Sequence, residues 1–174
     1  MFGLNLSSDP PDAIELLKND HDEVDGLFEE YEKAKEGGQT REKTSIAGRI
    51  CRALTVHATI EEEIFYPTVR RERGETGELV DEAAVEHQTL KDIIGRLEAA
   101  PASDPLYDAG VKVLKEYVKH HVKEEENELF PRVRKLDIDL VALGARMKAR
   151  KDELEGETAP PPAARRASRA AATH

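Results

Sequence analysis

Histidines are the residues of this sequence with the clearest potential for chemistry. The chain contains six, of which His174 is the last residue and His120 directly precedes another histidine. The remaining four are widely spaced: His21, His57, His87 and His121. Imidazole is the commonest metal ligand in proteins, and it also gains and loses protons near neutral pH. Metal binding and proton transfer are therefore the first two chemistries to consider.

Two of these histidines are followed by a glutamate four positions later. His57 precedes Glu61 in HATIEEEIFYP, and His121 precedes Glu125 in HVKEEENELFP. Residues at this spacing share one face of a helix, one turn apart. The two stretches align at a constant offset of 64 residues, which is an approximate internal repeat. The repeat predicts two helical hairpins, each with one lone histidine and one His-x-x-x-Glu pair.

Four long segments with helical periodicity must position these groups. Apolar residues recur three and four positions apart over about residues 12–35, 41–72, 78–99 and 104–131. Their short connections favour an up-down-up-down bundle. The sequence therefore predicts an all-α fold with a four-helix bundle over residues 1–135. A short C-terminal helix follows over 136–155, with a disordered Ala/Pro/Arg-rich tail over 156–174.

Each predicted helix carries one of the four spaced histidines on or beside its apolar stripe. Four neutral imidazoles in one core would need many buried partners, and four charged ones would repel each other. A metal ion resolves both problems. At about 1.5 Å of rise per residue, the six groups fall near one level of the bundle. The predicted metal ligands are His21, His57, Glu61, His87, His121 and Glu125.

The predicted ligand types suit iron, and also manganese, zinc or copper. Two bridging glutamates with two histidines on each metal would give a dinuclear site that keeps positions for a bridging oxygen and a small ligand. Five further glutamates lie beside the His-x-x-x-Glu pairs, and most of them are expected to face solvent: Glu62, Glu63, Glu124, Glu126 and Glu128. HExxH and CxxC are absent from the sequence, which argues against a zincin protease and a structural zinc ribbon.

The order H…HxxxE…H…HxxxE resembles the hemerythrin-like, or HHE cation-binding, family. The resemblance covers about residues 12–133, and the stretches EEEIFYP and EHQTLK are typical of bacterial members. It implies a four-helix bundle that holds two iron ions with an oxo or hydroxo bridge, and a small diatomic or peroxide ligand such as O2, peroxide or nitric oxide. Zinc or manganese remain alternatives to iron.

One position departs from the oxygen-carrying members of that family. They have HxxxH on the third helix, whereas His87 is followed at this spacing by Lys91. Glu126 lies five residues after His121, where those members have a carboxylate, but Glu125 fits the internal repeat better. The departure argues against reversible O2 carriage. It favours the variant domains associated with iron or oxygen sensing and with peroxide or nitrosative stress.

No catalytic residue is assigned from the sequence, but two residues are candidates to assist. Lys91 lies one turn after His87, and Tyr117 lies one turn before His121. Either side chain could donate a hydrogen bond or a proton to a bound oxygen species. Packing is the alternative for both. Cys51 is expected in the core, and His120 is expected to be exposed.

Composition narrows the classes of partner. The chain has 26 Lys and Arg against 36 Asp and Glu, a formal net charge of −10. This charge argues against binding to nucleic acid or to an anionic membrane surface. No apolar run approaches the roughly 20 residues of a membrane span. With one cysteine and no signal-peptide pattern at the first residues, we expect a cytoplasmic protein.

Three functional classes remain open at this point. The first, which we expect, is a di-iron protein that reacts with or senses O2, peroxide or nitric oxide, with enzymatic turnover as one form. The second is a non-catalytic sensor or interaction module whose fold stability depends on metal. The third is a metal-free helical interaction domain such as a histidine phosphotransfer module, which would need one exposed histidine and commonly HxxKG.

Overall fold

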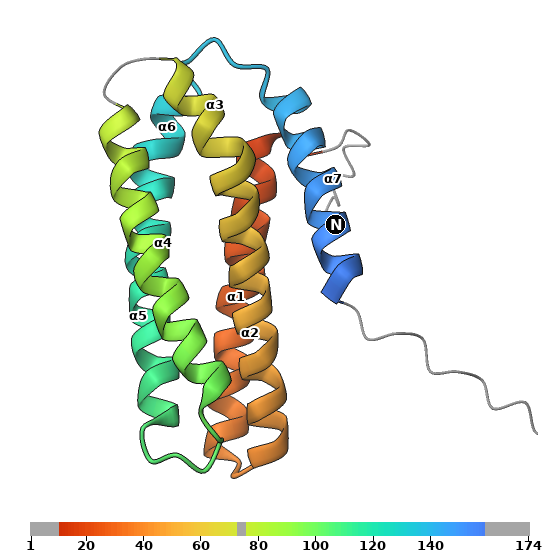
Figure 1. Cartoon of the computed structure of the whole chain (residues 1–174), viewed down its shortest axis with the longest axis vertical. Helices are drawn as coiled ribbons and strands as arrows, with labels where there is room; N and C mark the ends of the chain where they lie inside the picture. The colour runs from red at the N-terminus through yellow and green to blue at the C-terminus, as the bar shows by residue number, and fades with distance from the viewer. Residues whose placement is uncertain (1–10, 73–75, 159–174) are drawn as a thin grey trace, which may run out of the picture.

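A computed structural model describes residues 11–72 and 76–158, which contain helices and no strand. Four long helices lie side by side and alternate in direction along the chain (Figure 1). They are α1 (Ala13–Glu36), α2 (Thr40–Ile60), α4 (Thr76–Ala99) and α5 (Tyr107–Glu124). The predicted all-α, up-down-up-down four-helix bundle is confirmed.

A widened helical turn interrupts the second and fourth columns of the bundle at equivalent places. The π-helix η1 (Glu61–Phe65) follows α2, and the π-helix η2 (Glu125–Leu129) follows α5. The columns then continue as α3 (Tyr66–Arg71) and α6 (Phe130–Val133), each with proline as its second residue. Single π turns inside α-helices are frequent at functional sites. Here the first residue of each π-helix is a predicted metal ligand.

Two apolar clusters fill the bundle on either side of a polar layer. One cluster contains Phe28, Leu54 and Leu114, and the other contains Leu17, Phe65 and Leu129. Cys51 lies in the first cluster, as predicted. Charged residues cover the outer faces of the helices, and within the described ranges no helix is long and apolar enough to cross a membrane.

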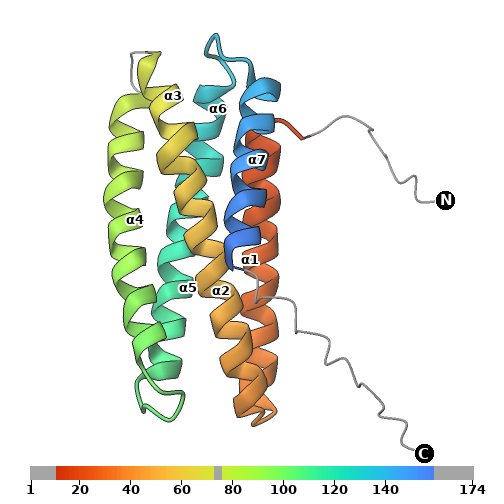
Figure 2. The same cartoon turned by 45° about the vertical axis from the view of Figure 1, so that its right-hand side comes forward.

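A further helix, α7 (Leu140–Thr158), packs outside the bundle against α1, α2 and η1 (Figure 2). Its buried Leu143 and Met147 join the apolar cluster that contains Leu17. The helix continues past the predicted end of the C-terminal helix, so residues 156–158, predicted as tail, are helical. The rest of the predicted tail, residues 159–174, lies outside the described residues.

Gly144 allows α7 to approach the start of α1 closely. A Cβ atom at this position would lie 2.7 Å from the backbone nitrogen of Ala13 and 2.7 Å from the carbonyl oxygen of Pro11. Backbone atoms cannot move aside as the end of a side chain can. The contact between α7 and the bundle therefore depends on the absence of a side chain here.

We expect Gly144→Ala to destabilise the protein by about 1–3 kcal/mol, because the added methyl group must push the two helices apart. Gly156→Ala is the matched control, because a Cβ there meets nothing within 4 Å in the same helix. The control should be neutral or stabilising by up to about 1 kcal/mol, the difference in helix propensity. Urea denaturation followed by circular dichroism measures both, and equal stabilities would contradict the close approach.

Candidate metal centre

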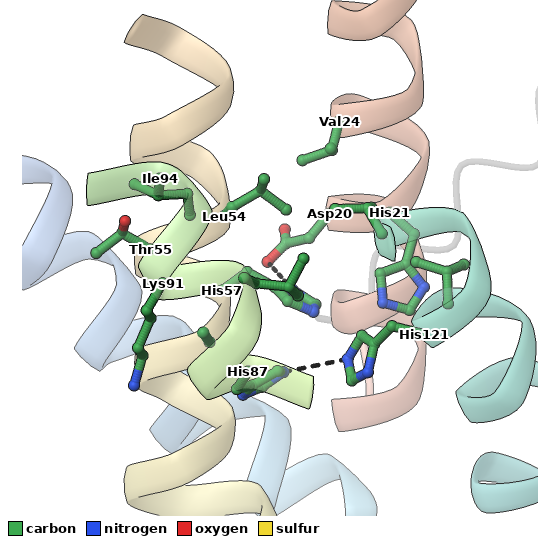
Figure 3. Close-up of a pocket in the computed structure, with 14 residues that line it drawn as sticks. Asp20, His21, Val24, Leu54, Thr55, His57, His87, Lys91, Ile94 and His121 are labelled. Carbon is green, nitrogen blue, oxygen red and sulfur yellow. Dashed lines mark hydrogen bonds and ion pairs between the residues drawn. The ribbon is translucent and has the colours of Figure 1, made fainter. Parts of the chain in front are cut away.

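All six predicted ligands lie in the polar layer between the two apolar clusters. The four histidines come from α1, α2, α4 and α5, and the two glutamates begin η1 and η2. Every one of the six is buried, and Glu61 is 0% exposed. Figure 3 shows the four imidazole rings around one pocket, each from a different helix. The bundle thus brings together residues that are up to 104 positions apart in sequence.

The Nε2 atoms of the imidazoles face the glutamates and each other. Glu61 Oε2 lies 3.2 Å from Nε2 of His57 and 3.3 Å from Nε2 of His87. Glu125 Oε2 lies 3.3 Å from Nε2 of His21 and 3.5 Å from Nε2 of His121. Two groups of ligating atoms result, one from His21, His57 and Glu125 and the other from Glu61, His87 and His121. Each carboxylate contacts one histidine of each group, as a bridging ligand would.

Several atoms of this layer lack a hydrogen-bond partner among the described residues. They are Nε2 of His21, Nε2 of His57, Oε1 of Glu61 and Oε2 of Glu125. Native proteins seldom leave buried polar atoms unpaired, because each one loses its hydration without compensation. Neutral imidazole nitrogen and carboxylate oxygen are also the atoms that coordinate transition metals. The residues present therefore fit a pair of metal ions.

The other ring nitrogen, Nδ1, of each of these histidines lies close to an acidic side chain. The pairs are His21 with Glu126 at 2.9 Å, His57 with Asp20 at 3.4 Å, His87 with Glu62 at 3.0 Å and His121 with Glu86 at 2.7 Å. A carboxylate in this position fixes the orientation and tautomer of a ligand histidine and increases its basicity. All four rings are thereby held with Nε2 toward the centre.

Glu62 and Glu126 are only partly exposed, because each carboxylate bonds to an imidazole ring of the layer. The positions of all four acidic partners follow a pattern in the sequence, because each one is adjacent to a predicted ligand. Asp20 and Glu86 each directly precede a lone histidine, and Glu62 and Glu126 each directly follow a glutamate of a His-x-x-x-Glu pair. The internal repeat therefore includes the acidic partners as well as the predicted ligands.

Each acidic partner also has a cationic or imidazole group on its outer side. Lys18 lies 3.7 Å from Glu126, Lys151 2.5 Å from Asp20, Lys91 2.6 Å from Glu62, and His120 3.4 Å from Glu86. Burial raises the pKa of Asp20, but its hydrogen bonds to His57 and Lys151 lower it to a net value below the usual one. Each ring is therefore backed by a carboxylate that is itself held in place.

Without metal, charges within the layer control its protonation. Burial lowers the pKa of His57, but the charge of Glu61 and the hydrogen bond to Asp20 raise it well above the usual value. Burial also lowers the pKa of His121, but the charge of Glu125 and the bond to Glu86 raise it to about 9. Burial raises the pKa of Glu61, yet His57 and His87 hold it well below the usual range. Imidazolium–carboxylate pairs thus hold the metal-free layer together.

Tyr66 is a residue of the centre that the sequence analysis did not identify. Its hydroxyl donates a hydrogen bond to Oε1 of Glu125 at 2.9 Å, and lies 3.3 Å from Nε2 of His87. Burial, together with the charges of Glu61 and Glu125, raises the pKa of Tyr66 well above its usual value, so the phenol keeps its proton. At the equivalent place in the second repeat, Phe130 stacks on His21. At this position the two halves of the centre therefore differ in one hydroxyl group.

We expect Tyr66→Phe to cost the metal-free protein about 1–3 kcal/mol of stability, because Glu125 loses a hydrogen bond in a buried site. Metal affinity should also change, since the phenol contacts a predicted ligand. The control is Tyr31→Phe, in which a buried hydroxyl that bonds Asp108 at 2.6 Å is lost far from the layer. It should lower stability and leave metal affinity unchanged. Calorimetric titration with metal measures the affinity of each variant. If Tyr66→Phe binds metal as tightly as the parent protein, Tyr66 does not contribute to the centre.

Lys91 and Tyr117, the two candidates to donate a hydrogen bond or proton to a bound oxygen species, lie in different surroundings. The prediction for Tyr117 is wrong, because its side chain is 45% exposed on the outside of α5. The buried residues of this helix include Val111, Leu114, Val118 and His121, and position 117 lies to one side of the stripe that they form. Lys91 lines the pocket beside the imidazoles, and its Nζ pairs with Glu62. It therefore contacts His87 only through Glu62.

His120 is exposed, as predicted.

Comparison with known proteins gives consistent results. The family model described as "Hemerythrin HHE cation binding domain" matches residues 12–133. The crystal structure of an HHE cation-binding domain-containing protein from Mycobacterium kansasii is similar, with a TM-score of 0.71 and 26% identity over 84% of this chain and 89% of that one. A protein of Nostoc sp. named DNA nickase is 34% identical over 122 residues. That match spans 69% of this chain but 33% of the relative.

Proposed function

The chain belongs to the hemerythrin HHE cation-binding family, and on this basis we propose that the buried layer holds two iron ions and reacts with O2, peroxide or nitric oxide. The observation that carries the proposal is the set of inward-facing Nε2 and carboxylate atoms that have no other partner among the described residues. When bound, a pair of iron ions would supply electrons and open coordination positions for a small ligand.

The protein's own residues would exclude water and admit a small molecule. The pocket over the imidazoles has mainly apolar walls, which include Val24, Leu90 and Val118. Such walls favour a diatomic molecule or peroxide over a larger polar substrate. The acidic partners of the imidazoles would keep the rings in place during reaction. Tyr66 would retain a proton on its hydroxyl, 2.9 Å from Glu125, and hold that carboxylate in position.

Anaerobic loading with Fe²⁺, followed by exposure to each small molecule, tests this function. We expect two irons per chain, an absorption change on exposure to O2, peroxide or nitric oxide, and consumption of peroxide over many turnovers. The Zn²⁺-loaded protein is the control, and it should show no absorption change. Two bound irons with no response to any of the three molecules would overturn the proposed reactivity.

A metal-dependent sensor is a second candidate, favoured by the position of α7. Lys151 of this outer helix contacts Asp20, which in turn contacts the predicted ligand His57. A change at the centre would thereby reach the surface of the protein. An absorption change without turnover of peroxide, together with altered protease sensitivity of α7, would select the sensor over the enzyme.

Strand nicking is not part of our proposal. The name DNA nickase belongs to a relative of which this chain matches a third. The formal net charge of −10 opposes binding to a polyanion. We therefore expect the iron-loaded protein to leave supercoiled plasmid intact, as measured by agarose gel electrophoresis in low salt. Metal-dependent conversion to the open-circular form would contradict this expectation.

A further inference from the structure

A second group of possible metal ligands lies on the surface beside the buried layer. Nε2 of His120 lies 3.2 Å from Oε1 of Glu124 and 3.4 Å from Oε1 of Glu86. Their ligating atoms all lie within 4.8 Å of one another. His120 and Glu124 repeat the His-x-x-x-Glu spacing of His121 and Glu125, displaced by one residue. One helix thus presents the same pair of ligand types inward and outward.

Among the four acidic partners, Glu86 has a distinct outer neighbour. The other three lie beside lysine side chains: Lys18, Lys91 and Lys151. A lysine ammonium group has no free lone pair, so it neutralises a carboxylate but does not coordinate metal. His120 has an imidazole nitrogen that can do so, and its side chain is 59% exposed. This corner of the layer therefore differs from the other three in offering a coordinating group to solvent.

Two members of the surface group, Glu86 and Glu124, also line a small hollow whose inner wall includes residues of the buried layer. Glu82, Glu86 and Glu124 line it from α4 and α5, and the buried His121 and Glu125 line it from within. Oε2 of Glu125, a residue only 2% exposed, accepts no hydrogen bond from any residue of the described ranges. Glu86 belongs to both sides, because one of its oxygens faces His120 and the other bonds His121.

We propose that His120, Glu124 and Glu86 form a surface site for a divalent metal ion, and that ions enter the buried layer from this site. The site captures the ion with one imidazole and two carboxylates, which suits Fe²⁺, Mn²⁺, Zn²⁺ or Co²⁺. The acidic lining of the hollow then attracts the ion toward Glu125. Entry rests on the proposed metal occupancy of the buried layer, whereas capture at the surface does not.

Equilibrium dialysis of the metal-free full chain against Co²⁺ tests the surface site. We expect three ions per chain for the parent protein and two for His120→Ala and Glu124→Gln. Both side chains lie outside the buried layer, so neither change removes a buried ligand. Glu116→Gln on the same helix is the matched control, since it removes one surface charge from a side chain that pairs with Lys112. It should still bind three.

The rate of loading tests entry. At limiting Co²⁺ in a stopped-flow spectrometer, the visible bands of the buried ions should appear about tenfold more slowly in His120→Ala, as expected when electrostatic capture is lost. Their final intensity should match that of the parent. Parent-like rates would overturn entry, and an unchanged count of ions in both variants would overturn the surface site.

If the proposed reactivity with O2, peroxide or nitric oxide fails, the results differ from those expected when the surface site fails. Co²⁺ counts and loading rates do not depend on O2 or peroxide, so an iron-loaded protein without reactivity leaves them unchanged. If the parent binds a single Co²⁺ that His120→Ala removes, the buried layer takes no metal, and entry is overturned together with the proposed centre.

Discussion

Replacing Glu61 with glutamine should reduce the chain from two tightly bound metal ions at the buried layer to at most one. Oε2 of Glu61 lies within 3.3 Å of histidine nitrogens from both groups, so the change affects both positions. Glutamine keeps the shape of the side chain, but its neutral amide is a weaker ligand than a carboxylate. If metal at a hundredfold excess over its dissociation constant no longer stabilises the fold, the melting temperature falls by about 5–10 °C.

The measurement is the difference in melting temperature between the metal-loaded and metal-free forms of each variant, together with metal analysis. Taking the difference removes any effect of Glu61→Gln on the metal-free fold. Glu63→Gln is the control, because this neighbour in η1 faces outward and pairs with Arg150. It should retain both ions and the full difference. Two ions in Glu61→Gln, with an unchanged difference, would remove Glu61 from the ligand set.

The metal-free protein should lose stability as the pH rises from about 6.5 to 9. The pKa of His121 is raised from 6.5 to about 9 in the fold, and that of His57 is also raised. A raised pKa stabilises the fold fully below the unfolded value, and this contribution disappears as the pH passes the folded value. For His121 alone, the shift amounts to about 3 kcal/mol. Glu61 has a lowered pKa, so its contribution is lost instead on acidification.

Bound metal should reverse this dependence of stability on pH. Ligand histidines must be neutral to coordinate, so bound metal competes with their protons, and the stability that it adds should increase with pH. Denaturant unfolding at several pH values, with metal or with a chelator, measures both trends. Metal-free stability that stays level or rises between pH 6.5 and 9 would contradict the imidazolium–carboxylate pairing within the layer.

The arrangement of the predicted ligands could be derived from sequence because regular helices have a fixed periodicity. His21 and His87 lie on apolar stripes, and level matching along antiparallel helices places them beside the His-x-x-x-Glu pairs. Long-range contacts then follow from the bundle itself. Whether metal occupies these residues remains a prediction for the experiments above.

Tyr66 could not be placed by the same reasoning, because the helix that carries it is not regular. In an α-helix, a residue five positions after Glu61 lies about 140° around the axis, on a different face. The π-helix η1 widens this turn, and the backbone N–H of Tyr66 bonds to the carbonyl oxygen of Glu61. The wider turn returns Tyr66 to the layer. A lone sequence contains no periodic signal for a widened turn.

Helical periodicity also does not predict where α7 packs on the bundle. The sequence indicates a helix, but the choice of bundle face depends on particular tertiary contacts. Lys151 pairs with Asp20, Arg150 pairs with Glu63, and Gly144 meets backbone from the start of α1. These pairs join residues more than 80 positions apart, so no local pattern contains them.

Matching π-helices in the two halves have a consequence for the ancestry of this chain. A widened turn is costly to maintain, and two that begin at glutamates 64 residues apart and each precede a proline are most simply the copies of one. A single ancestral hairpin with one lone histidine, one His-x-x-x-Glu pair and this turn would have built the same set of six ligands by pairing with a second copy. Gene duplication and fusion would then have freed each half to diverge. On this origin, a symmetric dimer of the hairpin would have carried the hydroxyl of Tyr66 twice or not at all, and the pairing of Tyr66 with Phe130 would record the later divergence.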